Sequence, residues 1–399
     1  MGEGALAEKR FDMTPVLWLT SWYPSRVNPT NGDFVERHAR AVAAFTPLIV
    51  LLIEKDESLR AGKTEILKSE EKNLIVYKVY YGKSGWGKSL EKIFSVLKYR
   101  NLQKKMYADI QRKYGTPSLV HVHIAMKAGM LALYLKSRYR IPFILTEHWT
   151  GYFKESQPNI YTTGNALRDL IKKVIRQATQ LFPVSVSLGE KIAETISPVP
   201  YTMIPNVVDT TIFKYEVSNP PVFRFIHPSY LNYQKNPEGM IEAAALLANQ
   251  GYRFELMLFG NNNSALVSLA KQKGVLNTYV FINDFVSYPE VAAQMRQSSA
   301  LLMFSRFENL PCVVLEALCC GLPVISSSVG GIAEVINQSN GILVDSEDVA
   351  GLSNAMKKII DSYSLFDRSA IAESASEKFS FPVVGKQYFD WYNKIIRRG

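Results

Sequence analysis

Short runs of apolar residues alternate along the chain with segments in which apolar residues recur every three to four positions. In the first half, the apolar runs of strand length lie at residues 16–24, 48–53, 74–79, 119–124, 143–148 and 181–185. Patterns typical of helices separate them, for example at 126–139 and 165–179. Continuous apolar runs indicate strands that are buried on both faces, so this order predicts a doubly wound parallel sheet.

A second, similar series begins near residue 222. Its strand candidates lie at 222–228, 254–260, 279–282, 300–304, 323–326 and 341–344. Helices are predicted between them at roughly 237–250, 264–273, 289–297 and 312–320. Because 399 residues are too many for one ordinary core, we predict an α/β fold with two Rossmann-like doubly wound domains facing a cleft. Ligands of such sheets bind at the carboxyl ends of the strands.

The composition is that of a globular protein, with 47% hydrophobic and 21% charged residues. No apolar run reaches the roughly 18 to 20 residues that a membrane-spanning helix needs. Residues 1–13 mix charged and small residues and lack the apolar core of a signal peptide, so we expect a disordered tail on a cytoplasmic protein. The three cysteines, Cys312, Cys319 and Cys320, are expected to be small buried hydrophobic residues rather than metal ligands or disulfide partners.

The charge is distributed unevenly. Residues 1–205 contain 30 Lys and Arg and 18 Asp and Glu, a net charge of +12, whereas the remainder has a net charge of −2. This surplus indicates a polyanionic partner, such as an anionic membrane or a phosphorylated substrate. Basic and aromatic residues interleave in residues 83–113, which is typical both of a helix lying on an anionic membrane and of a solvated surface helix. No nucleic-acid motif is present, so no nucleic-acid partner is expected.

The segment S-R-F-E-N-L-P-C-V-V-L-E-A-L-C-C-G-L-P-V-I places two carboxylates, Glu308 and Glu316, eight positions apart. Pro311 fits the first turn of a helix, which puts Glu308 in the loop at a strand's carboxyl end and Glu316 inside the helix. Free amides at the helix start, at Asn309 and Leu310, are suited to hold phosphate or sugar oxygens. One carboxylate is placed to bind a sugar hydroxyl and the other to bind a ribose.

This Glu-x7-Glu pattern, followed by Ala-Leu-x-x-Gly-x-Pro-Val-Ile, resembles the signature of retaining family 4 glycosyltransferases, which have the GT-B architecture of two Rossmann-like domains. The resemblance extends over nearly the whole chain from Thr14. It implies an acceptor-binding domain at 14–205, a nucleotide-sugar-binding domain at 206–380, and a closing helix at 381–399 that packs back on the N-terminal domain.

Further segments are similar to those of the family. N-P-T-N-G-D-F resembles its glycine-rich loop, in which Gly32 would let the backbone approach the donor phosphates. T-E-H-W-T-G resembles the segment whose histidine, here His148, lies near the reacting sugar. I-P-N-V-V-D resembles the interdomain segment and contributes Asn206, and N-D-F-V matches the nucleobase region, where Phe285 is placed to stack.

S-Y-L-N-Y-Q-K-N-P resembles the family's diphosphate site and contributes Ser229 and Lys235. The family usually has an arginine where this chain has Tyr230. Two replacements for its charge are open at this point: a neighbour such as Arg306, or Asn232 together with backbone amides.

The resemblance implies retaining transfer of a hexose-type sugar from a UDP- or GDP-sugar to a hydroxyl of a glycan or lipid-linked acceptor, in bacterial surface polysaccharide synthesis on the cytoplasmic face of the inner membrane. Glu308, His148 and Lys235 would be catalytic, and Glu316, Asn309, Leu310 and Pro311 would bind the donor. The chain has no Asp-x-Asp after a strand, so neither a metal nor a cofactor is expected. Two alternatives stay open: another GT-B enzyme, such as a nucleotide-sugar epimerase or a phosphorylase, and a non-enzymatic polyanion-binding protein.

Overall fold

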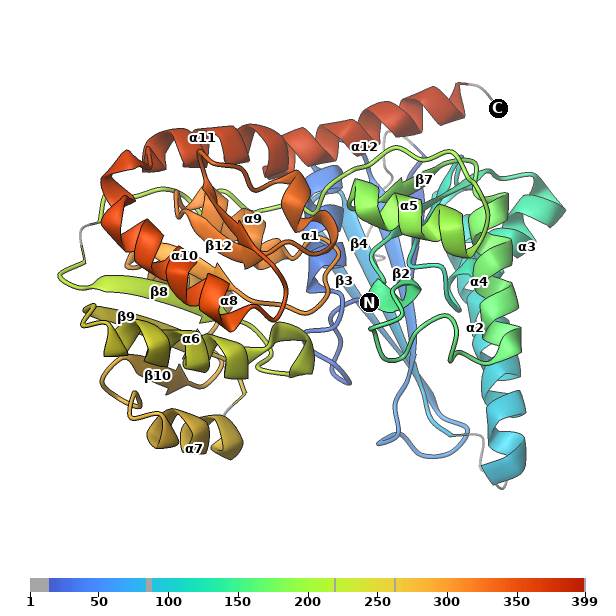
Figure 1. The fold of residues 1–399 in the computed structure, drawn as a ribbon. Coiled ribbons are helices and arrows are strands. Elements are labelled where there is room, and N and C mark those ends of the chain that lie inside the picture. Colours follow the sequence, from blue (N-terminus) through green and yellow to red (C-terminus); the bar gives the residue numbers. More distant parts are fainter. Residues whose placement is uncertain (1–13, 84–87, 219, 262, 398–399) are drawn as a thin grey trace, which may run out of the picture.

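Two α/β domains stand side by side in the computed structural model, which describes residues 14–83, 88–218, 220–261 and 263–397 (Figure 1). The tail predicted at residues 1–13 lies outside the described residues, as do residues 84–87 of the predicted basic segment. None of the described helices combines the length and the apolar character that crossing a membrane would require.

The N-terminal domain is built on a seven-stranded sheet with the order β3-β4-β2-β1-β5-β6-β7. Its strands are β1 (Val16–Thr20), β2 (Leu48–Lys55), β3 (Thr64–Glu71), β4 (Leu74–Tyr81), β5 (Val120–His123), β6 (Phe143–Glu147) and β7 (Leu181–Pro183). Its helices are α1 (Asp33–Ala43), α2 (Lys88–Tyr114), α3 (Gly129–Tyr139), α4 (Asn165–Gln177) and α5 (Val186–Thr195), with a short 3₁₀ turn η1 (Thr150–Tyr152).

The predicted parallel sheet also has one antiparallel strand, which lies at its edge. β3 pairs antiparallel with β4, whereas the other strands of this sheet pair in parallel. β3 has the sequence TEILKSEE and is almost wholly exposed. A two-sided polar strand at an edge has neither the apolar run nor the alternation by which strands are recognised in a sequence.

The C-terminal domain has a six-stranded, all-parallel sheet with the order β10-β9-β8-β11-β12-β13. Its strands are β8 (Phe223–Pro228), β9 (Phe254–Phe259), β10 (Val280–Asn283), β11 (Ala300–Met303), β12 (Val324–Ser327) and β13 (Gly341–Val344). Its helices are α6 (Pro237–Asn249), α7 (Ser264–Gln272), α8 (Tyr288–Arg296), α9 (Cys312–Cys319) and α10 (Val349–Asp361), with 3₁₀ turns η2 (Tyr233–Lys235), η3 (Gly330–Glu334) and η4 (Tyr363–Leu365).

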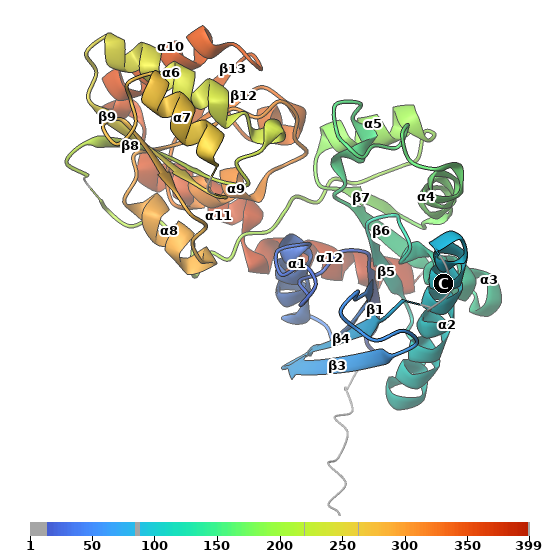
Figure 2. The same ribbon diagram turned by 90° about the horizontal axis from the view of Figure 1, so that it is seen from below.

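The last two helices connect the domains. α11 (Arg368–Phe379) lies over the C-terminal domain, and α12 (Phe381–Ile396) crosses to the N-terminal domain beside α1 (Figures 1 and 2). One face of α12 is buried in the N-terminal core at Val384, Tyr388, Tyr392 and Ile395, a spacing that follows the helical repeat. The Trp18 indole of β1 donates a hydrogen bond of 3.1 Å to the Tyr392 hydroxyl. These contacts hold the end of the chain to the first domain.

Candidate functional site

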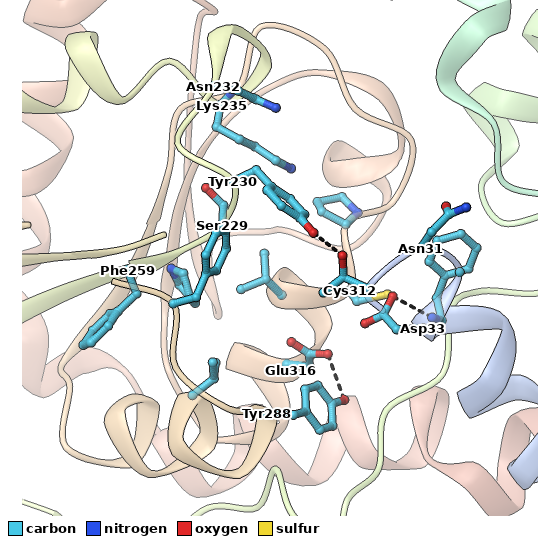
Figure 3. A pocket seen from close by; sticks show the side chains of 18 of the residues that line it. Asn31, Asp33, Ser229, Tyr230, Asn232, Lys235, Phe259, Tyr288, Cys312 and Glu316 are labelled. Atoms are coloured by element: carbon cyan, nitrogen blue, oxygen red, sulfur yellow. Dashed lines mark hydrogen bonds between the residues drawn. The ribbon is translucent and has the colours of Figure 1, made fainter. Parts of the chain in front are cut away.

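A cleft of about 710 Å³ lies between the domains, beyond the carboxyl ends of strands from both sheets. The loop after β1 and the start of α1 form one side, and the segments after β8, β10 and β11 form the other. Figure 3 shows Asn31 and Asp33 on the first side and Ser229, Tyr230 and Lys235 on the second. The predicted site residues that line this cleft are Gly32, Ser229, Lys235, Phe285, Glu308, Pro311 and Glu316.

Gly32 makes possible the close approach of two backbone segments. It precedes α1 with a φ of +75°, and a Cβ atom at this position would lie 2.5 Å from the carbonyl carbon of Trp22. Only glycine adopts this conformation without strain and also leaves the room. The loop thus packs tightly against the end of β1 while it lines the cleft.

Glu308 and Lys235 form an ion pair within the cleft. Glu308 is 4% exposed, and the Lys235 side chain is also largely buried. Lys235 belongs to η2, and the Gln234 side chain next to it donates a hydrogen bond of 3.1 Å to the backbone carbonyl of Phe307. The sequence placed these two charges in separate motifs, and the fold brings them into contact.

Glu316 is 5% exposed and has two partners. The Tyr288 hydroxyl donates a hydrogen bond of 3.0 Å to its Oε1 atom, which Figure 3 shows, and the Arg37 Nη1 atom lies 3.3 Å from the same oxygen. Burial raises the pKa of Glu316, and Arg37 acts against that rise, whereas Asp33 adds to it. Neither Arg37 nor Tyr288 was predicted from the sequence as a site residue. The one signal for Arg37 was a charge four positions before Ala41, on the buried face of α1.

A smaller cavity of about 230 Å³ adjoins the cleft and shares Glu308 and Pro311 with it. His148, Asn206, Asn309 and Leu310 line this cavity. Both ring nitrogens of His148 and the side-chain oxygens of Asn206 and Asn309 are buried and make no hydrogen bond within the described residues. Burial lowers the pKa of His148 well below its usual value, so the imidazole is neutral near pH 7.

The rings of the buried residues His148, His123 and His121 pack against one another in a column that begins at His148. The rings of His121 and His123 lie 4.1 Å apart, and His123 stacks on His148 at 5.9 Å. His121 and His123 are fully buried and border neither cavity. The Tyr392 hydroxyl lies 2.7 Å from the Nδ1 atom of His121, so the column reaches α12.

The surroundings of Tyr230 bear on the two expected replacements for the missing arginine. Arg306 forms an ion pair of 2.9 Å with Glu347 and is not among the residues that line the cleft. Asn232 does line the cleft. The Tyr230 ring meets Phe285 edge-on at 5.1 Å, and its hydroxyl is in hydrogen-bond contact with that of Thr30.

The cysteine prediction holds for two of the three residues. Cys319 and Cys320 are free and fully buried, whereas Cys312 lines the cleft beside Arg37. Cys312 is the first residue of α9, where the helix faces the opening, and this explains the difference. Among the residues in the described ranges, no group of three or more His, Cys, Asp or Glu side chains is arranged to hold a metal ion.

Further contacts across the domains lie beside the cleft. The Glu334 carboxylate of η3 accepts hydrogen bonds from the backbone amides of Val186, at 2.9 Å, and Ser187, at 2.8 Å. These are the first two amides of α5, so an acidic side chain of one domain caps a helix of the other. The Asn309 side chain donates a hydrogen bond to the backbone carbonyl of His148. These bonds connect the two domains directly.

Two family models match the chain. The model described as Glycosyltransferase Family 4 matches residues 83–212, and the model described as Glycosyl transferases group 1 matches residues 209–378. The glycogen synthase of Mycobacterium tuberculosis is 26% identical over 273 residues, which make up 65% of this chain and 66% of the relative. The putative teichuronic acid biosynthesis glycosyltransferase TuaC of Bacillus subtilis is 23% identical over 366 residues, 86% of this chain and 88% of the relative.

A solved structure is similar along almost the whole chain. Anabaena HepE, in complex with UDP and glucose, superimposes with a TM-score of 0.70 at 15% identity, covering 96% of this chain and all of that one. At this level of identity the likeness concerns the fold.

Proposed function

The chain is a glycosyltransferase of family 4 with the GT-B architecture that its sequence predicted, and on this premise we propose that it moves a sugar from a nucleoside diphosphate sugar to an acceptor hydroxyl with retention of the anomeric configuration. One observation carries the proposal. Two ion pairs, Glu308 with Lys235 and Glu316 with Arg37, lie in a single interdomain cleft that is large enough for a nucleotide sugar.

The proposed division of labour follows the position of each group. Glu316, deep in the cleft, binds the ribose, and Phe285 at the rim stacks on the base. Lys235 and the amides at the start of α9 receive the diphosphate, since a helix start favours anions. Ser229 and the loop at Gly32 complete the walls of the phosphate region.

Bond breaking separates charge: the diphosphate leaves with negative charge, and positive charge develops at the anomeric carbon. Lys235 would neutralise the first and Glu308 the second. Because the two side chains already form an ion pair, an incoming diphosphate competes with Glu308 for the ammonium group. The carboxylate is thereby released to orient the hydroxyls of the donor sugar.

The smaller cavity is suited to the transferred sugar. Four buried polar atoms there make no hydrogen bond within the described residues: two on His148, one on Asn206 and one on Asn309. Buried polar atoms without partners are costly, and sugar hydroxyls can both donate to them and accept from them. The neutral imidazole of His148 can do either, depending on its tautomer.

For the acceptor, we propose a glycan or a lipid-linked glycan of bacterial surface polysaccharide synthesis. The name of the B. subtilis relative concerns such a polymer. On α2, Ile93 is 58% and Leu97 46% exposed, close to the basic residues of the segment 83–113. Such a surface favours an anionic membrane on the cytoplasmic side. Co-sedimentation with phosphatidylglycerol vesicles but not with phosphatidylcholine vesicles is expected, and equal binding to both would contradict the membrane proposal.

The donor can be tested by calorimetry with UDP-, GDP- and ADP-sugars on the wild type and on Glu316→Gln. We expect the sugars of one of these three nucleotides to bind and Glu316→Gln to lower their affinity, because a hydrogen bond to a charged group is worth roughly 1.5–3 kcal/mol. Transfer should survive EDTA, and the anomeric proton of the product should show the configuration of the donor. A folded wild type that binds none of these donors would refute the proposal and favour the polyanion-binding alternative.

A further inference from the structure

Arg37 reaches from one domain into the donor site of the other. It lies on α1 of the N-terminal domain, and its side chain is 10% exposed. The guanidinium lies 3.3 Å from Asp33, one turn earlier on α1, and 3.3 Å from Glu316 on α9 of the C-terminal domain. It also covers the ring of Tyr288 on α8 at 4.8 Å. Contacts with three elements fix where this cation lies.

The two partners of Glu316 occupy one side of its carboxylate. Tyr288 and Arg37 both contact the Oε1 atom. The second oxygen, Oε2, makes no hydrogen bond to any residue in the described part of the chain, and Glu316 borders the cleft. A carboxylate has about four acceptor sites, so the Oε2 atom keeps its capacity for a ligand hydroxyl. Because the acid is held by one oxygen, the other is left for a ligand of the cleft that Glu316 lines.

We propose that Arg37 is a positioning residue for donor binding: from across the cleft it pairs with the Glu316 carboxylate and orients it, so that the Oε2 atom accepts a ribose hydroxyl only when the two domains are closed. This inference rests on the proposed function, because it takes the ligand of Glu316 to be the ribose of a nucleotide sugar. It makes Arg37 a link between donor binding and domain closure, since a ligand that binds one conformation better shifts the population toward it.

The charges around Glu316 show what the loss of Arg37 would do. The titratable groups that interact with it are Arg37 and Asp33 on α1, Tyr288 on α8, and the thiols of Cys312, Cys319 and Cys320 along α9 and at its end. Arg37 is the cation among these groups. Without it, a buried carboxylate would lie near a second carboxylate, and both effects favour the protonated form. A protonated Glu316 loses the charge that strengthens its bond to a hydroxyl.

The test measures the affinity for a nucleotide sugar as a function of pH. Each phosphate of a nucleotide sugar is bonded on two sides and lacks the second ionisation, with a pKa of about 6, of a phosphate monoester, so a pH dependence between about pH 6 and pH 8.5 reports on the protein. Four proteins are compared by calorimetry: the wild type, Arg37→Met, Arg37→Met with Glu316→Gln, and Arg40→Met. Arg40 is a matched control, because it lies on the same helix, is half exposed, and pairs with Glu36 and Glu71 away from the cleft.

The wild type and Arg40→Met should bind with equal affinity and little pH dependence. Arg37→Met should bind at least about tenfold more weakly near pH 6 and recover in part as the pH rises. The double variant should be weak and independent of pH. Wild-type affinity in Arg37→Met, or a uniform loss without pH dependence, would overturn the proposal. A wild type that binds no nucleotide sugar would instead refute the proposed function itself, and this inference with it.

Discussion

Replacing Gly32 by alanine would perturb the loop that joins β1 to the donor cleft. The residue has a φ of +75°, and a non-glycine residue in this region costs about 1–2 kcal/mol. Alanine also restricts the unfolded chain, but this effect of about 0.4–1 kcal/mol is smaller than the strain at a positive φ and only partly offsets it. The backbone term alone is therefore about 1 kcal/mol.

Packing contributes a second term at Gly32. The added Cβ would lie 2.5 Å from the carbonyl carbon of Trp22 and 2.6 Å from the amide nitrogen of Tyr23. Both are backbone atoms, so the loop itself must move, and overpacking of this kind costs about 1–3 kcal/mol. The total for Gly32→Ala is about 2–4 kcal/mol. The displaced loop precedes α1, which carries Arg37, so donor affinity should fall as well.

Gly62 provides a matched control in the same domain. Its φ is +79°, but a Cβ there would have no atom within 4 Å. Gly62→Ala should therefore lose only the backbone term and keep full donor affinity. The assay is the urea midpoint together with nucleotide-sugar affinity for both variants. If the two variants lost the same stability and bound the donor equally well, the claim that Gly32 is required by close packing at the cleft would be refuted.

Two further predictions concern the domain contacts and acid stability. Glu334→Gln removes the charge that caps α5 across the domains, so we expect the unfolding free energy to fall by about 0.5–2 kcal/mol. Glu347→Gln is the control, because it changes an exposed ion pair and should cost under about 0.5 kcal/mol. Equal losses of the two variants in thermal unfolding would contradict the capping role of Glu334. Burial lowers the pKa of His38 to about 4. As the pH falls, the unfolded chain therefore takes up a proton at this histidine at a higher pH than the folded chain does. The unfolding free energy should fall by roughly 3 kcal/mol for this group as the pH drops from about 6.5 to 4. His38→Gln should reduce the slope of the urea midpoint over this range, and an unchanged slope would show that other groups carry the acid sensitivity.

The sequence predicted most of the fold because buried strands reveal themselves by their apolar runs. Every strand except β3 coincides with a predicted run to within a few residues, and β3 has two apolar residues, both largely exposed. The position of β3 follows from the unpaired edge of β4, which is known only once the sheet has been assembled. Local patterns thus recover elements that bury their own side chains, and they miss an element that is defined by its neighbour.

The residues of the candidate site likewise fall into those that a local sequence pattern reveals and those that it does not. Glu308, Glu316 and Lys235 stand in local motifs with recognisable spacing, so they could be found before the fold was known. Arg37 could not be assigned a role, because its partner Glu316 is 279 positions away on another domain. The same holds for Glu334, whose carboxylate binds amides 147 and 148 positions earlier. Motifs identify what a segment binds locally, and the assembly of the domains decides which charges meet.

The charge of the cleft distinguishes the proposed donor from the anionic partner proposed for the basic half of the chain. The charged residues that line the cleft are Asp33, Arg37, Lys235, Glu308 and Glu316, three acids and two bases. A donor diphosphate adds negative charge to this set, so its binding must depend on helix-start amides and on the two paired cations rather than on a general positive field. The surplus of +12 in residues 1–205 is therefore located mainly elsewhere. Long-range charge of that kind acts on extended anionic surfaces, and salt screens it strongly, whereas short contacts in a buried cleft are screened much less. Raising the salt concentration should thus weaken vesicle binding much more than donor binding, and equal salt dependence of the two would show that one basic surface serves both ligands.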